Sequence, residues 1–177
     1  MNLKKTKILI IFITFLICFI SHFTYEILPN PLFSIFFPVN ESIWEHMKML
    51  FTSILLSGII EYIIIKKNNI NPNNYLFSKF IEAFISIPIY LTIYLPIYYK
   101  IGEKMILNII LLFIVIIIVE YIGYKLMTKS ENNLNILAII LIIISYSIFT
   151  YLTYYPIKNQ IFLDTKNEKY GIDLPIN

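Results

Sequence analysis

Residues 105–127 form one apolar run, MILNIILLFIVIIIVEYIGYKLM, whose only charged residues are Glu120 and Lys125. A helix that crosses a bilayer needs about 20 predominantly apolar residues. A helix is also the economical form for such a run, because it satisfies its own backbone hydrogen bonds in lipid. The run therefore predicts a transmembrane helix. Four other segments are comparably long and apolar, so we expect five helices, Ile8–Leu28, Ile43–Ile65, Phe80–Tyr99, Met105–Met127 and Leu134–Tyr155.

The composition of the whole chain favours the same class of protein. Hydrophobic residues make up 58% of the 177 residues and charged residues only 14%, whereas a soluble domain needs a larger polar surface. The predicted fold class is all-α, a polytopic membrane protein whose five-helix bundle forms a single integral-membrane domain over residues 1–177. The lipid bilayer is the expected partner. Nucleic acid is not expected, because the net charge of +3 is small and divided among short loops.

The distribution of lysines predicts the orientation in the cell membrane, since cytoplasmic loops carry an excess of positive charge. With the N-terminus in the cytoplasm, eight lysines fall on that side, namely Lys4, Lys5, Lys7, Lys66, Lys67, Lys79, Lys125 and Lys129. The opposite loops then hold only Lys100 and Lys104, with Lys48 at the start of the second helix. The tail adds Lys158, Lys166 and Lys169 on that side, offset by Asp164, Glu168 and Asp173. Five crossings place the C-terminus outside, on the same side as residues 38–46.

Residues 38–46, PVNESIWEH, form a polar segment at the start of the second helix. One interpretation of this segment is structural. Residues 42–45 have the S-x-x-E spacing of a capping box, which satisfies the first amide groups of a helix. Acidic residues favour the positive end of the helix dipole, and Trp44 suits the membrane interface. This interpretation leaves His46 and Asn40 unexplained.

The second interpretation is chemical and joins the segment to the end of the first helix. His22 and Glu26 are four residues apart and share a helical face, which falls in the outer third of the membrane, near His46. Ionisable residues at membrane depth are costly and usually serve a function. The candidate catalytic residues are His22, Glu45 and His46, with Glu26, Glu41 and Asp164 in support.

Two imidazoles with several carboxylates can form an acid–base pair or hold a divalent metal such as Zn²⁺ as a cofactor. The candidate metal ligands are His22, His46 and Glu45. No H-x-x-x-H or H-E-x-x-H spacing is present. The metal therefore stays one alternative beside acid–base chemistry and beside simple hydrogen bonding of the histidines.

A second group of carboxylates, Glu61, Glu82 and Glu120, is expected near the cytoplasmic interface. Clustered there, they could bind or relay cations or protons. We favour a simpler alternative, in which they are acidic side chains at the level of the lipid headgroups, because the ends of membrane helices tolerate such charges. The neighbouring lysines in this alternative are Lys66, Lys67, Lys79 and Lys125.

Two segments on the outer side are also apolar. Residues 32–37, LFSIFF, are too short to span a membrane and are expected to dip into the interface or to cover the outer end of the bundle. In the tail, residues 161–163 are expected to return to that end and to place Asp164 and Tyr170 over it. The alternative is a solvated, frayed terminus.

Motifs at both ends of the chain resemble those of one known family. Residues 38–48, PVNESIWEHMK, resemble the Asn-Glu-Ser-x-Trp-Glu-His signature of an uncharacterised family of small prokaryotic integral-membrane proteins, a domain of unknown function. His22 matches a histidine late in that family's first helix. The C-terminal motif of the family is matched by residues 155–156 (YP), 162–164 (FLD) and 170–172 (YGI). Residues 164–169 depart from the pattern, because they lack its proline and glycine. The resemblance spans nearly the whole chain and implies no activity.

Two classes of function follow from these observations. The first is a membrane-embedded hydrolase or transferase that acts on a lipid-linked or exported substrate through the His/Glu site. The second is non-enzymatic transport, assembly or sensing, with the outer end and the tail as a partner surface. Five helices are few for a solitary transporter, so the second class predicts a homo-oligomer or a membrane partner. An enzyme predicts side chains that converge around a lipid-accessible cavity, whereas a partner surface predicts an exposed apolar or aromatic patch without one.

Overall fold

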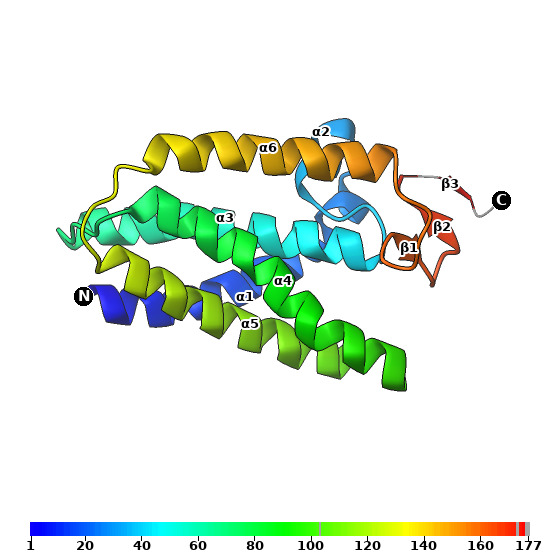
Figure 1. Cartoon of the computed structure of the whole chain (residues 1–177), viewed down its shortest axis with the longest axis horizontal. Coiled ribbons are helices and arrows are strands. Elements are labelled where there is room, and N and C mark those ends of the chain that lie inside the picture. Colours follow the sequence, from blue (N-terminus) through cyan, green and yellow to red (C-terminus); the bar gives the residue numbers. More distant parts are fainter. Residues whose placement is uncertain (103, 173, 176–177) are drawn as a thin grey trace.

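The computed structural model describes residues 1–102, 104–172 and 174–175. These ranges contain six helices and three two-residue strands (Figure 1). The helices are α1 (Leu3–Ile27), α2 (Pro31–Phe36), α3 (Ile43–Lys67), α4 (Tyr75–Ile101), α5 (Met105–Met127) and α6 (Asn135–Tyr154). The strands are β1 (Leu163–Asp164), β2 (Lys169–Tyr170) and β3 (Leu174–Pro175), and they form one antiparallel sheet in that order.

Five of the helices, all except α2, are long and apolar enough to cross a membrane by their length and composition. The predicted fold class, an all-α bundle of five transmembrane helices, is confirmed. α5 begins and ends at the predicted residues, and the ends of α3 and α6 lie within two residues of the predicted ones. α1 and α4 each begin five residues earlier than expected. Each extension contains a lysine, Lys7 or Lys79, that is neutralised inside the bundle, so the charge does not end the helix.

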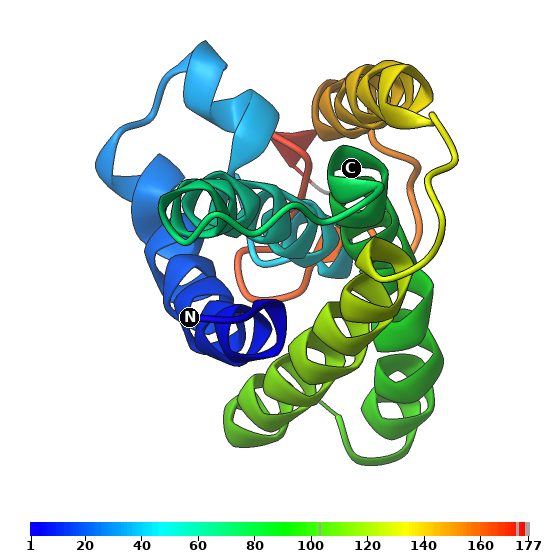
Figure 2. The ribbon, with the colours of Figure 1, turned by 90° about the vertical axis from the view of Figure 1, so that its left-hand side faces the viewer.

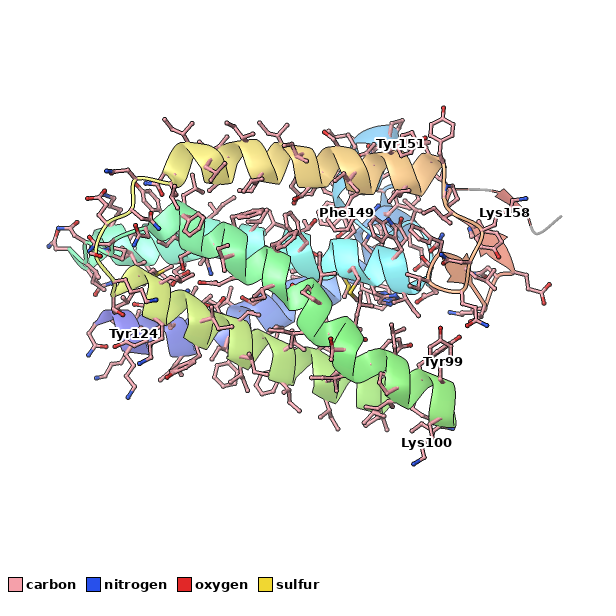
Figure 3. All side chains as sticks on the ribbon, in the orientation of Figure 1. Tyr99, Lys100, Tyr124, Phe149, Tyr151 and Lys158 are labelled. Carbon is pink, nitrogen blue, oxygen red and sulfur yellow. The ribbon has the colours of Figure 1, made fainter. Side chains whose placement is uncertain are left out.

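α3 is the central helix of the bundle. In its most apolar 18-residue stretch, 61% of the residues are buried, against 17–33% in the other four long helices. Viewed along the bundle, α3 lies among α1, α2, α4 and α6, and α5 bridges α1 and α4 (Figure 2). From α6, Phe149 points toward α3 and packs near Trp44 and Phe51, whereas Tyr151 points away from the bundle (Figure 3).

The tail folds over one end of the bundle, which we call the tail end, and α2 packs beside α6 near this end (Figure 1). The Phe36 ring of α2 packs on Tyr146 of α6, with centroids 4.9 Å apart. In the tail, the carbonyl of Ile161 accepts a hydrogen bond from the backbone N–H of Trp44 at 2.9 Å. The Phe162 ring stacks on the Trp44 indole, with ring centroids 4.8 Å apart. The predicted return of the tail is confirmed. Trp44 was expected only to lie at the membrane interface. In the structure it packs between α6 and the tail.

Gly171 fixes the tail at a position where only glycine fits. Its φ of +55° lies in the left-handed region, and a Cβ at this position would lie 2.3 Å from the carbonyl oxygen of Thr153. The Gly171 carbonyl accepts the side-chain amide of Asn40 at 2.8 Å. The N–H of the next residue, Ile172, donates to the same Thr153 carbonyl at 3.1 Å. These contacts join the tail to the end of α6 and to the loop that precedes α3.

The opposite end of the bundle holds a buried cluster of five charged side chains. Lys7 Nζ of α1 lies 2.6 Å from Glu82 and 2.8 Å from Glu120, and it lies 3.2 Å from Glu61. Lys79 contacts the same three carboxylates. All five side chains are at most 5% exposed, and together they join α1, α3, α4 and α5. Lys79 is thus a partner of these carboxylates, as the favoured prediction had it. That prediction is wrong in placing them at the level of the lipid headgroups, because they are buried and clustered inside the bundle.

Candidate functional site

Two histidines and a carboxylate meet at the tail end of the bundle. His22 lies near the end of α1, His46 in the first turn of α3, and Glu41 in the loop before α3. The two imidazole rings have centroids 5.3 Å apart. Oε2 of Glu41 lies 3.4 Å from His22 Nε2 and 3.7 Å from His46 Nε2. The predicted approach of the two histidines is confirmed, and both of them face the same carboxylate oxygen.

The backbone fixes the orientation of the His46 ring. Its Nδ1 lies 2.8 Å from the carbonyl oxygen of Ser42, the N-cap of α3. A carbonyl only accepts hydrogen bonds, so Nδ1 carries the proton, and the lone pair of the neutral ring is on Nε2, toward Glu41. The hydroxyl of Ser42 also accepts the Glu45 N–H at 3.3 Å. The residue that caps the helix thus also aims His46 into the site.

The tail holds the backbone of Glu41 in place. Its N–H donates to Oδ2 of Asp164 at 3.1 Å. Asp164 is buried and also accepts the N–H groups of Lys166 and Asn167, each at 3.0 Å. Burial acts to raise the pKa of Asp164, but the hydrogen bonds from Asn167, Glu41 and Lys166 outweigh it and hold the pKa below its usual value. Asp164 is therefore an ionised residue that positions Glu41.

Glu41 remains a carboxylate over the physiological pH range. The hydrogen bond from His22 is the largest cause that lowers its pKa, and it outweighs the opposing effect of partial burial. The charges of His22, His46 and Lys166 add to the effect, so the pKa is about 2, against an ordinary value of 4.5. Lys166 Nζ lies 3.8 Å from the other oxygen, Oε1. Glu41 can thus accept a hydrogen bond or bind a cation.

The structure does not bring the side chain of Glu45 to the histidines. Its Oε1 accepts the Thr153 hydroxyl at 2.7 Å, and its Oε2 accepts the Val39 N–H at 3.1 Å and pairs with Lys48 Nζ at 2.6 Å. Lys48 also donates to the carbonyl of Ser34 at 2.8 Å. This buried network joins α2, α3 and α6. These contacts give Glu45 a structural role.

The predicted capping box forms only in part. Ser42 caps α3 as expected, but the Glu45 carboxylate is occupied by the network just described. The N–H of Ser42 donates instead to Oδ1 of Asn40 at 2.9 Å. Because Asn40 also donates to Gly171, it links the start of α3 to the tail. This contact gives Asn40 the structural role that the sequence left unexplained.

The cluster of His22, Glu41 and His46 borders two large cavities of different character. One has a volume of about 570 Å³ and a mainly apolar lining, which includes Cys18, Phe19, Phe23, Met47, Met105 and Leu112. The other has a volume of about 330 Å³ and largely polar side chains, which include Tyr25, Glu26, Asn40, Asn167 and Lys169. His22, Glu41 and Lys166 line both cavities. The site therefore lies where a polar pocket meets an apolar cavity.

The apolar cavity opens toward the surface that would face lipid. Phe19, Phe23 and Met105 line it, and these side chains are 40%, 49% and 72% exposed. All three come from the apolar faces of α1 and α5. The exposed part of the lining of this cavity is therefore continuous with the apolar surface of α1 and α5.

Several residues of the site were missed by the sequence analysis. Tyr90 and Asn108 line the apolar cavity beside His46, and Lys166 lies against Glu41. The spacing of Tyr90, Tyr94 and Tyr98 places them on one face of α4, and this signal was present in the sequence. Lys166 gave no such signal, because its position depends on how the tail folds.

Comparison with known proteins gives a family and no activity. No curated protein and no solved structure matches the chain. One family model does match, over residues 1–172. The matched range includes the helices that carry His22 and His46 and the tail that carries Asp164. The chain therefore belongs to the family DUF6512, a family of unknown function.

Proposed function

We propose that this chain is an integral-membrane enzyme, a hydrolase or transferase, which acts on an amphiphilic substrate at the tail end of the bundle. The observation that carries the proposal is the position of His22, Glu41 and His46 at the junction of an apolar cavity and a polar pocket. Enzyme sites are typically concave and mostly apolar, with a few convergent polar groups. A partner surface would not need these three groups to converge beside a cavity.

An amphiphilic substrate suits the two cavities. A volume of about 570 Å³ lies within the usual range for small-ligand sites, and the apolar lining favours an alkyl or isoprenoid chain. The polar head of the substrate then lies at the histidines. Lys166 provides a positive charge there, which favours an anionic head group such as a phosphate ester.

The cluster contains the groups that ester cleavage requires. A water molecule attacks the phosphorus or carbonyl carbon while Nε2 of His46 accepts its proton. The Glu41 carboxylate stabilises the imidazolium that forms. The bond to the leaving oxygen breaks, and that oxygen takes the proton from His46, which returns the ring to its neutral form. In a transferase, an acceptor hydroxyl replaces the water.

The tail end is proposed to face the outside of the cell membrane. The N-terminal amine donates to Oδ1 of Asn68 at 2.7 Å, so the N-terminus lies at the same end as the loop between α3 and α4. The lysine-rich segments 4–7 and 66–67 are at that end. Because cytoplasmic segments are rich in lysine, this arrangement supports the proposal that the substrate is taken from the outer leaflet.

The proposal is tested by turnover of amphiphilic esters. The purified chain in lipid nanodiscs is incubated with chromogenic carboxylate and phosphate esters that share a leaving group and differ in alkyl chain length. We expect turnover to increase with chain length until the cavity is filled. His46→Ala and His22→Ala should each lower turnover by about 100-fold or more at unchanged protein level, which is the usual contribution of acid–base catalysis.

Two matched variants serve as controls for this experiment. Lys158 and Glu168 are exposed tail residues, so Lys158→Ala and Glu168→Gln should retain wild-type turnover, whereas Lys166→Ala should weaken selectively the use of phosphate esters. The proposal is wrong if no ester of any chain length is turned over faster by the wild type than by His46→Ala.

A further inference from the structure

We propose that His22, Glu41 and His46 bind one divalent transition-metal ion such as Zn²⁺. The proposal rests on the site of the proposed function and deepens it. One ligand atom from each residue lies within 4.8 Å of the other two. In a tetrahedral zinc site with bonds of roughly 2.1 Å, neighbouring ligand atoms are about 3.4 Å apart. The distances from Glu41 Oε2 to the two Nε2 atoms, 3.4 and 3.7 Å, are close to this spacing.

Hydrogen bonds from the surroundings of the site orient two of the three ligands, His46 and Glu41. A histidine that binds a metal usually donates its other ring N–H to a carbonyl or carboxylate, and His46 does so through Nδ1 to Ser42. Glu41 is held through its backbone by Asp164. Nδ1 of His22 is buried and has no hydrogen-bond partner among the described residues. Nε2 is therefore the atom through which His22 makes its polar contact, and it faces the same point as His46 Nε2.

The chemistry of the ligands selects the class of metal. Two imidazoles with one carboxylate favour Zn²⁺ and neighbouring first-row ions over Mg²⁺ and Ca²⁺, which prefer oxygen ligands. Lys166 pairs with Oε1 of Glu41 and is 73% exposed, so Oε2 stays available to the ion. Three protein ligands leave a fourth position for water or substrate, as in catalytic zinc sites.

The other carboxylate cluster provides an instructive contrast. Oxygens of Glu61, Glu82 and Glu120 are also close enough to hold an ion. Two ammonium groups, Lys7 and Lys79, already occupy the space among them. The cluster at the tail end has no buried ammonium at its centre among the described residues, and it borders both cavities. An ion there would activate a water molecule or polarise an ester oxygen.

The proposal is tested by metal binding without any substrate. The full chain is purified in detergent, stripped with a chelator and titrated with Zn²⁺ by calorimetry, and the bound metal is counted by mass spectrometry. We expect one ion per chain in the wild type and binding about 100-fold weaker or more in His22→Ala, His46→Ala and Glu41→Ala. Zn²⁺ should also raise the Tm of the wild type by mass action and leave that of His46→Ala unchanged.

Two variants control for non-specific binding to carboxylates. Glu26→Ala changes a carboxylate of the neighbouring polar pocket, and Glu168→Ala changes an exposed one. Both should retain wild-type affinity for Zn²⁺. The metal proposal is overturned if the His22→Ala/His46→Ala double variant binds Zn²⁺ as tightly as the wild type, or if the wild type binds none.

The two proposals fail in different ways. A chain that binds no Zn²⁺ but still turns over amphiphilic esters would overturn the metal proposal and support the proposed function through acid–base chemistry alone. A chain that binds one ion through the three residues, but turns over no amphiphilic ester, would support the metal proposal and overturn the proposed function.

Discussion

Nε2 of His22 and Oε2 of Glu41 lie 3.4 Å apart, and this contact joins the end of α1 to the loop that begins α3. His46 faces the same oxygen from the first turn of α3. The geometry of the site therefore depends on a single carboxylate, whose charge is set by its two neighbours. The backbone of that carboxylate is in turn held by Asp164 of the tail.

The folded protein should lose stability in acid through Glu41. Its pKa in the folded state is about 2, below the ordinary value of 4.5. A lowered pKa stabilises the fold at pH values above about 4.5, and this contribution is lost as the pH falls toward 2. Glu41→Gln lacks the contribution at every pH. We expect the Tm difference between the wild type and Glu41→Gln to shrink as the pH falls through this range.

Thermal unfolding of both proteins in one detergent, followed from neutral to acid pH, measures this effect. Glu168→Gln is the matched control, because Glu168 is an exposed glutamate of the same tail. A Tm difference between the wild type and Glu41→Gln that does not change with pH would show that Glu41 is not held as a carboxylate by the histidines.

The buried charge cluster should be necessary for the stability of the bundle. Lys7→Met leaves three buried carboxylates with one ammonium, Lys79. Removing one partner of a buried ion pair typically costs about 3–5 kcal/mol, because the remaining charge is uncompensated. Unfolding by a denaturing detergent should show a loss of this order. Lys4→Met, at an exposed lysine of the same helix, should change stability little.

A second variant separates the effect of charge from the effect of packing in this cluster. Glu82 is the closest partner of Lys7, at 2.6 Å. Adding Glu82→Gln to Lys7→Met removes one of the uncompensated charges, so the double variant should recover part of the lost stability. Further loss in the double variant would show that the hydrogen bonds of Glu82, including the one from Ser78, matter more than its charge.

The sequence predicted the membrane helices well because the signal is local. Each apolar run contains its own evidence, and α5 was placed to the residue. The sequence around Lys7, in the second turn of α1, did not indicate what this lysine contacts. Lys7 was counted only as a cytoplasmic charge, whereas its partner Glu120 is 113 residues away in the chain. Nothing in the local pattern distinguishes a lysine that faces the headgroups from one that neutralises buried carboxylates.

The sequence also could not show whether Glu41 or Glu45 faces the histidines, because this depends on contacts with residues far away in the chain. Both residues are close to His46 in the sequence, and both were candidates. Glu45 is drawn away by Lys48 and by Thr153, which lies 108 residues later. Glu41 is left to face the histidines because the tail holds its backbone. The two histidines of the site could thus be predicted from the sequence, but the carboxylate that faces them depends on long-range contacts.

The orientation in the membrane can be tested with reporter fusions. The loop of residues 68–74, between α3 and α4, is expected in the cytoplasm, and the C-terminus outside. A reporter that is active only after export should therefore be active when fused after Asn177 and silent when fused after Asn71. The reverse pattern would place the His/Glu site on the cytoplasmic side.

Substitution of Ser42 should lower mainly the stability of the protein, whereas substitution of His46 should lower mainly its turnover. Ser42→Ala removes the hydroxyl that accepts the Glu45 N–H, so it should lower the free energy of unfolding by about 1 kcal/mol. His46→Ala keeps that cap, and it keeps the backbone hydrogen bond from its own N–H to the Ser42 carbonyl at 3.1 Å. Its stability should therefore stay close to that of the wild type, while its turnover falls. Thermal melts and ester turnover, measured on the same preparations, distinguish the two effects. If His46→Ala and His22→Ala both retain full turnover at normal protein levels, the histidines have no chemical role, and residues 38–46 serve only to start α3 and to hold the tail.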